Sequence, residues 1–171
     1  MIPENNIRAY MGWCYAKAKE SPDPSTQNAA IVVAPHDDAA NTKYILGLGI
    51  NRFPDGVRYT DERWERPLKY KWVEHAERNA IYDAARRGVA LEGATMVCPW
   101  AACSDCARAV IQSGITRVVT HKQAHDRSPE FWLEEIKFAF QMWEEAGIEL
   151  EFYDGPVGIL DVRMNGELWN P

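Results

Sequence analysis

Residues 117–153 read RVVTHKQAHDRSPEFWLEEIKFAFQMWEEAGIELEFY, the clearest strand–helix–strand pattern in the chain. Residues 117–121 and 148–153 have the pattern of strands, whereas residues 129–146 have helical spacing that stops at Gly147. A helix of this length between two strands forms a crossover. The two strands are therefore predicted to run parallel, joined by a right-handed connection.

Upstream of this stretch, the same periodicities predict three more helices and three more strands. The helices are residues 5–20, 74–87 and 103–113. The strands are residues 29–33, 44–50 and 94–98, of which the first two form a hairpin through the polar turn 36–42. The order α-β-β-α-β-α-β-α-β predicts one α/β domain over residues 1–171, with three α-β-α layers around a mixed five-stranded sheet. No repeat or linker divides the chain.

The helix predicted at 129–146 carries more apolar surface than one stripe needs. One stripe contains Trp132, Ile136, Ala139 and Trp143, and a second set contains Phe131, Phe138 and Met142. A helix with apolar residues beyond one stripe is buried on more than one side. Two alternatives are considered for what buries the second apolar set of this helix: the patternless tail after Asp154, or a second subunit.

Composition and charge exclude several classes of protein. No apolar run approaches the ~18 residues of a membrane span, and the N-terminal segment lacks the apolar core of a secretory signal, so a cytoplasmic protein is predicted. The formal net charge is −6, which argues against a long nucleic-acid partner. A small nucleotide remains compatible, because a few local cations are enough to hold it.

The cysteines point to metal or redox chemistry rather than to a disulfide framework. Cys103 and Cys106 form a C-x-x-C, whereas Cys14 and Cys98 stand alone and are predicted to be small buried apolar residues. His75 opens one predicted helix and Cys103 opens another. One imidazole and two thiolates form a three-ligand zinc set whose fourth tetrahedral position is open to water.

Other interpretations of this set explain less. Thioredoxin-like redox chemistry would use the C-x-x-C but leave His75 and Glu77 unexplained. A structural zinc would need a fourth protein ligand, for which His121 and His125 are the candidates.

Glu77 is the predicted proton carrier of the site. Two thiolates cancel the formal charge of Zn²⁺, so the ion is a weaker Lewis acid than one held by three neutral histidines, and its water needs a base. Glu77 lies two residues after His75, from where it can reach that water without being a ligand. It is therefore assigned the role of proton shuttle for that water.

His75-Ala76-Glu77 followed by Cys103-x-x-Cys106 resembles the signature of zinc nucleobase deaminases, in which the glutamate is not a ligand. The chain is similar to the cytidine and deoxycytidylate deaminase superfamily over about residues 23–121. The segments that most resemble the deoxycytidylate branch are 23–27 (DPSTQ), 47–51 (GLGIN), 75–81 (HAERNAI) and 107–115 (ARAVIQSGI). The resemblance implies a cytidine-deaminase-like fold, one catalytic zinc, and hydrolysis of dCMP to dUMP and ammonia.

The chain departs from the family pattern at three places. Ala102 stands before the first cysteine, where proline is usual. Residues 51–72, predicted to be a long loop, contain no Cys or His, so the second, structural zinc of several relatives is not expected and one zinc per chain is predicted. Ile50 and Arg52 flank Asn51 where the group regulated by dCTP and dTTP typically has Tyr and Gly, so that regulation is not expected here.

Substrate contacts are predicted from Asn51, Asn79, Ser104 and Arg52. Asn51 follows a strand at the position where the superfamily places an asparagine against the sugar, and Asn79 suits the nucleotide branch. The phosphate needs a cation or a helix N-terminus. The candidates are Arg52, Arg58, Arg63, Arg66, Lys69, Lys71 and Ser104, among which the sequence does not choose. Trp64, Trp72 and Trp100 are either base-stacking or core residues.

Alternative functions remain open at this point. The substrate could instead be a free base, a nucleoside or a modified cytidylate. A deaminase similar to tRNA adenosine deaminase is disfavoured by the acidic charge, and a catalytically dead zinc-binding module is disfavoured by Glu77. The resemblance also implies a homo-oligomer, either a dimer or a hexamer.

Overall fold

A five-stranded mixed sheet forms the centre of the computed structural model, which describes residue 2, residues 4–35 and residues 41–171. The helices are α1 (Glu4–Ala18), α2 (Asp61–Trp64), α3 (Ala76–Arg86), α4 (Ser104–Gln112), α5 (Lys122–Asp126) and α6 (Glu130–Glu145), with 3-10 helices η1 (Thr42–Tyr44) and η2 (Leu68–Lys71). The sheet strands are β1 (Ala29–Val33), β2 (Ile45–Ile50), β3 (Thr95–Val97), β4 (Arg117–His121) and β5 (Glu149–Tyr153). A separate two-stranded sheet contains β6 (Val162–Met164) and β7 (Glu167–Trp169).

The strand order is β2-β1-β3-β4-β5, and the predicted fold class is confirmed. β1 pairs antiparallel with β2 as the predicted hairpin and antiparallel with β3. β3, β4 and β5 run parallel, so the two strands joined by the last helix have the predicted orientation. Most of the hairpin turn predicted at 36–42 lies outside the described residues.

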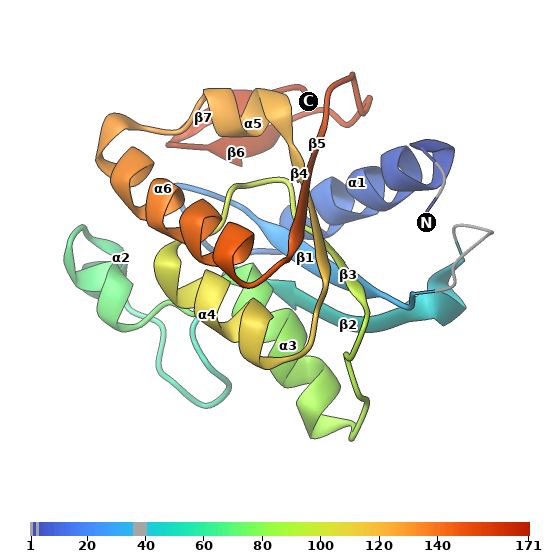
Figure 1. Cartoon of the computed structure of the whole chain (residues 1–171). Helices are drawn as coiled ribbons and strands as arrows, with labels where there is room; N and C mark the ends of the chain where they lie inside the picture. The colour runs from blue at the N-terminus through green and yellow to red at the C-terminus, as the bar shows by residue number, and fades with distance from the viewer. Residues whose placement is uncertain (1, 3, 36–40) are drawn as a thin grey trace.

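Helices cover both faces of the sheet (Figure 1). One face packs against α3, α4 and α6, with Ala80, Val110 and Trp143 among the buried residues. The other face packs against α1, through residues that include Tyr10 and Met11. The three inner strands β1, β3 and β4 are buried along their whole length, whereas the edge strands β2 and β5 are partly exposed. Three layers therefore form two apolar clusters, one on each side of the sheet.

α3 lies unusually close to the edge strand β2, and two glycines make this possible. A Cβ atom on Gly49 would lie 2.2 Å from the Ala76 carbonyl oxygen and 2.3 Å from the Ala80 backbone nitrogen. A Cβ atom on Gly47 would lie 2.3 Å from the Ala80 carbonyl oxygen. Ala76, Ala80 and Ala84 recur every four residues and form the matching face of the helix. This packing places the start of α3, with His75, at the end of β2.

We expect Gly49→Ala to lower the free energy of unfolding by about 1–3 kcal/mol, since the methyl group would push α3 away from β2. Gly12→Ala is the matched control, because its Cβ would only meet Val157 at 3.6 Å inside helix α1. Helix propensity favours alanine there by about 0.5–1 kcal/mol. Denaturant unfolding of both variants measures the difference. Equal stabilities would mean that α3 tolerates the extra atom.

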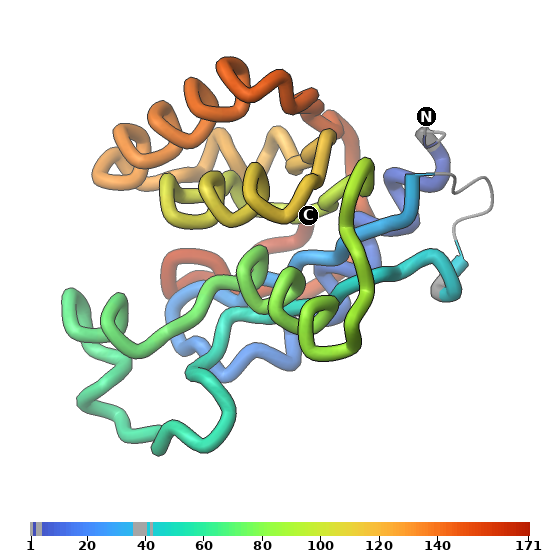
Figure 2. The backbone as a smooth tube through the Cα atoms, turned by 60° about the horizontal axis from the view of Figure 1, so that its bottom comes forward, coloured from blue at the N-terminus to red at the C-terminus, as the bar shows by residue number. Residues whose placement is uncertain are grey.

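The region predicted as a loop at 51–72 contains two short helices, α2 and η2. Both are four residues long, too short to produce a periodic apolar pattern, which explains why the sequence did not reveal them. Figure 2 shows this segment on the same side of the molecule as the start of α6. The short helix α5 was also not predicted.

The tail after Asp154 packs on the α1 side of the sheet and not on the side where α6 lies. Val157, Val162 and Trp169 pack in the cluster that contains α1, so the first of the two alternatives considered, a tail folded over α6, does not hold. Its hairpin β6–β7 was not predicted, because strands of three residues carry too little alternation to recognise. Phe131 and Phe138 of α6 remain exposed, and their burial by a second subunit stays a prediction.

Within the described residues, no helix has both the length and the apolar character that crossing a membrane requires.

Candidate metal centre and cleft

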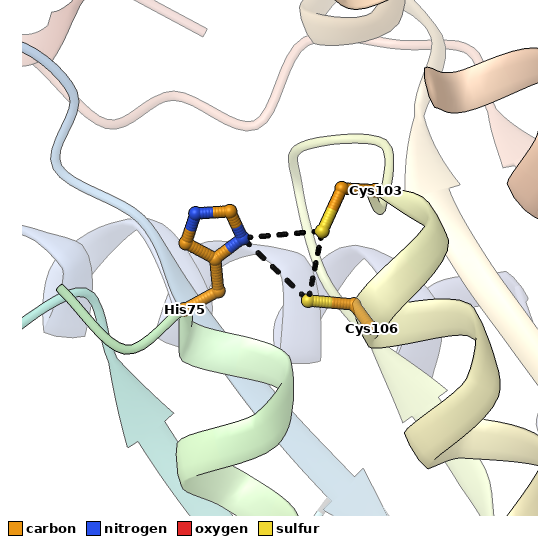
Figure 3. Close-up of side chains that lie close together, drawn as sticks. All are labelled: His75, Cys103 and Cys106. Atoms are coloured by element: carbon orange, nitrogen blue, oxygen red, sulfur yellow. Dashed lines mark hydrogen bonds between the residues drawn. The ribbon is translucent and has the colours of Figure 1, made fainter. Parts of the chain in front are cut away.

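Three predicted ligands meet between the starts of two helices (Figure 3). His75 is the residue directly before α3 and Cys103 the residue directly before α4, while Cys106 lies in the first turn of α4. The His75 Nδ1 atom lies 3.5 Å from Cys103 Sγ and 3.6 Å from Cys106 Sγ, and the two sulfurs are 3.5 Å apart. Both helix N-termini direct positive dipole ends toward the sulfurs, which favours thiolates.

These distances fit a tetrahedral zinc ion. Zinc–nitrogen bonds of about 2.0–2.1 Å and zinc–sulfur bonds of about 2.3 Å place ligand atoms about 3.5–3.8 Å apart. Among the described residues, no fourth His, Cys, Asp or Glu joins the cluster. His121 instead bonds to the Tyr15 hydroxyl and the Gly155 carbonyl, and His125 packs against Phe140. The described residues therefore supply three ligands, fewer than the four protein ligands of a closed structural zinc site.

Arg78 supports the two cysteines, a contact that the sequence interpretation missed. Its Nη1 atom lies 3.5 Å from Cys106 Sγ and 4.0 Å from Cys103 Sγ, and its Nε atom donates to Glu74. A guanidinium beside two thiolates stabilises their negative charge. The pKa of Cys103 is lowered to about 3, first by its hydrogen bond with Cys106 and then, against the effect of burial, by His75, whereas burial and the hydrogen bond with Cys103 raise the pKa of Cys106. The sequence signal for this contact was the spacing of Arg78, which lies one helical turn after His75 and so on the same face of the helix.

Glu77 is buried beside this cluster without belonging to it. Its side chain is 3% exposed, and its Oε2 atom has no hydrogen-bond partner among the described residues. Burial raises the pKa of its carboxyl above the ordinary value. A carboxyl with a free, buried oxygen can both accept and return a proton, which a solvated carboxylate does less readily.

The metal cluster opens into a cleft that His75, Glu77 and Cys103 line. Its walls come from the loop before β1, from the segment 51–72, from the turn after β3 and from the start of α6. The lining residues are Asp23, Thr26, Asn28, Asn51, Arg66, Lys69, Tyr70, Val73, His75, Glu77, Trp100, Ala101, Cys103 and Trp132.

The tail hairpin supports one wall of this cleft. The Gly166 N–H donates to the Ser25 carbonyl at 2.7 Å, and the Asn165 N–H donates to the Thr26 hydroxyl at 3.2 Å. Thr26 lines the cleft, so the last residues of the chain hold the loop before β1 in place. The sequence interpretation considered this tail only as a cover for the helix at 129–146.

Of the four predicted substrate contacts, the structure places Asn51 in the cleft wall. Its Oδ1 atom accepts from the Ala76 N–H at 2.9 Å, and its Nδ2 atom donates to the Thr26 carbonyl at 3.1 Å. Asn51 therefore caps α3 from a distant part of the chain and connects it to the loop before β1. This contact orients the helix turn that carries Glu77.

The other three are not brought to the cleft wall. Asn79 donates to the Ile50 carbonyl at 2.7 Å and connects β2 to α3. Arg52 forms an ion pair with Asp55 at 2.9 Å. Ser104 bonds to Glu135 of α6 through both its hydroxyl and its backbone N–H.

Only two of the predicted phosphate-binding cations, Arg66 and Lys69, line the cleft. Arg63 instead lies over the Trp72 ring at 3.8 Å, and Trp64 stacks on Phe53. Trp100 lines the cleft, as its interpretation as a base-stacking residue required.

Two further aromatic residues of the cleft, Tyr70 and Trp132, were not predicted as site residues. Trp132 had been placed on the apolar stripe of the last helix, but it is partly exposed and its ring faces His75 at a centroid distance of 6.1 Å. The only sequence signal for Trp132 as a site residue was its position in the first turn of α6, because His75 and Cys103 also lie at helix starts.

The chain matches known deaminases over most of its length. Residues 4–122 match the family model described as the cytidine and deoxycytidylate deaminase zinc-binding region. An uncharacterised deaminase encoded in the luxG 3′ region of Aliivibrio fischeri is 35% identical over 142 residues, which are 82% of this chain and 86% of that protein. The deoxycytidylate deaminase of Homo sapiens is 29% identical over 127 residues, covering 71% of this chain and 67% of that protein.

Solved structures support the fold. The crystal structure of dCMP deaminase from the cyanophage S-TIM5 superimposes with a TM-score of 0.65 at 23% identity, and the match covers 90% of this chain and 100% of that chain.

Proposed function

Because the chain belongs to the cytidine and deoxycytidylate deaminase family and is a hydrolytic deaminase, we propose that its substrate is dCMP, which it converts to dUMP and ammonia. The observation that carries the proposal is the open three-ligand cluster with buried Glu77 at the floor of a cleft that also holds cations. Relatives named as deoxycytidylate deaminases support the choice of a cytosine nucleotide.

One zinc ion per chain, held by His75, Cys103 and Cys106, supplies Lewis acidity and a water of lowered pKa when it is bound. Arg78 offsets part of the charge that the thiolates contribute.

Glu77 transfers protons in this proposal. Its buried carboxylate accepts a proton as the water oxygen bonds to C4, and it delivers that proton to N3. The second proton of the water then passes through Glu77 to the amine nitrogen, and the C4–N bond breaks to release ammonia and leave a carbonyl at C4. Asn51 keeps the turn that carries Glu77 in place through its bond to Ala76.

Aromatic side chains enclose the base. Trp132 and Trp100 line the cleft beside His75 and offer flat apolar surfaces to a pyrimidine ring. They also exclude bulk water, which strengthens the electrostatic effect of every charge in the cleft.

A panel of substrates tests the proposal by release of ammonia from the zinc-loaded protein. The panel contains cytosine, cytidine, deoxycytidine, dCMP, dCTP and guanine. We expect the highest kcat/KM for dCMP. Turnover of a free base with no turnover of dCMP would reject the nucleotide assignment while leaving the deaminase chemistry intact.

A further inference from the structure

The cleft has a polar end formed by one short segment of the chain. Arg66, Lys69 and Tyr70 all line the cleft and lie within five consecutive residues at η2. The metal cluster lies at another part of the same cleft. The sequence offered several cations for an anionic group, and their surroundings in the structure distinguish between them.

Lys69 is not available to a ligand, because its charge is already used. Its Nζ atom donates to both oxygens of Asp23, at 2.8 and 3.0 Å, and to the Ser25 hydroxyl at 2.7 Å. An ammonium group has three protons, so these bonds occupy all of them. Lys69 and Asp23 are 4% and 2% exposed, and this buried pair attaches the segment 51–72 to the loop before β1.

Arg66 differs from Lys69 in each of these respects. It is exposed at the cleft, and its guanidinium lies over the Phe131 ring at 5.5 Å. No Asp or Glu in the parts of the chain that the structure describes forms an ion pair with it. Since Lys69 neutralises Asp23, Arg66 leaves this end of the cleft with a net positive charge.

The Tyr70 hydroxyl is the second group at this end of the cleft, beside Arg66. Its oxygen is buried in the cleft wall, and Arg66 is close enough to act on it as a hydrogen-bond donor. Burial raises the pKa of Tyr70, and Arg66 opposes that rise, so the hydroxyl stays protonated and can donate. With the guanidinium beside its oxygen, the hydroxyl can still donate its own proton to an anionic ligand.

One aromatic ring separates these groups from the metal cluster. The Trp132 ring lies 6.1 Å from the His75 ring and 5.5 Å from the Tyr70 ring, measured between centroids. A nucleotide has the same order of parts: the base carries the reacting carbon, and a sugar separates it from the 5′-phosphate. A base beside His75 and Glu77 would therefore direct its phosphate toward Arg66 and Tyr70.

We propose that the Arg66 guanidinium and the Tyr70 hydroxyl form an anion subsite that binds the 5′-phosphate of the substrate. The inference rests on the proposed function for the identity of the base, but the subsite itself requires only a phosphate group. A guanidinium binds phosphate through paired N–H donors, which the Tyr70 hydroxyl supplements.

The test compares zinc-loaded wild type with Arg66→Gln, Tyr70→Phe and the matched control Arg63→Gln. Arg63 lies in the same segment but packs on Trp72 outside the cleft lining. For Arg66→Gln we expect kcat/KM for dCMP to fall about 10–150-fold, mainly through KM, because a hydrogen bond to a charged group contributes about 1.5–3 kcal/mol. Activity on deoxycytidine, which has no phosphate, should be unchanged. Tyr70→Phe should show a smaller loss of the same kind, and Arg63→Gln none.

Inorganic phosphate binding, measured by calorimetry, separates this inference from the proposed function. If wild type does not deaminate dCMP but binds phosphate, and Arg66→Gln loses that binding, the substrate is wrong and the subsite stands. If Arg66→Gln keeps its affinity for phosphate, or loses activity equally on dCMP and deoxycytidine, the subsite is overturned.

Discussion

Glu77→Gln is expected to keep its zinc and to lose about 10²–10⁴-fold in kcat, the usual contribution of a positioned acid–base group. Glutamine has nearly the shape of glutamate, so the buried space beside His75 stays filled. It cannot carry a proton from the water to N3, and so the reaction loses its shuttle. Steady-state ammonia release, together with the zinc content of the purified protein, measures both quantities.

The control for this variant is Glu144→Gln, at an exposed position in the last turn of α6. It removes the same charge far from the cleft and should leave kcat unaltered. Loss of zinc from Glu77→Gln would contradict the assignment, because it would show that the carboxylate is a ligand.

Cys103→Ser is expected to remove the zinc and, with it, a measurable part of the stability. Zinc that binds only the folded chain, present at about 100–1,000 times its dissociation constant, stabilises that chain by about 2.7–4.1 kcal/mol. Serine is a poor ligand in place of a thiolate, so this contribution disappears. Denaturant unfolding with and without a chelator should show a large difference for wild type and none for the variant.

Cys14→Ala provides the matched cysteine control. Cys14 is fully buried on the opposite face of the sheet, where its thiol contacts the Val97 carbonyl at 3.2 Å. This variant should lose some packing energy but keep one zinc and the response to the chelator. A Cys103→Ser protein that still responds to the chelator like wild type would rule out Cys103 as a ligand.

The strand–helix–strand pattern of 117–153 was sufficient to predict the parallel pair β4–β5, because a crossover of that length leaves little choice of direction. The three members of the metal cluster were also predictable. Cys103 and Cys106 lie one helical turn apart at the start of α4, and His75 lies at the start of α3. The position of each ligand side chain therefore follows from the local geometry of a helix N-terminus. The short helices α2 and η2 escaped notice because four residues show no period.

The surroundings of the metal cluster depended on contacts between residues far apart in the chain. Asn51 reaches Ala76, Arg78 reaches Cys106, and Lys69 is neutralised by Asp23; the sequence shows none of these pairings.

Spacing within single helices and strands was enough to predict the five sheet strands, the four long helices, the parallel crossover and the set of side chains that can hold a metal. Tertiary contacts were needed to place Trp132 beside His75, and to show that Asp23 pairs with Lys69 while no described carboxylate pairs with Arg66. The physical reason is that the charge and burial of a loop residue depend on its neighbours in space. Those neighbours are set by how the segment 51–72 packs against the loop before β1 and the start of α6.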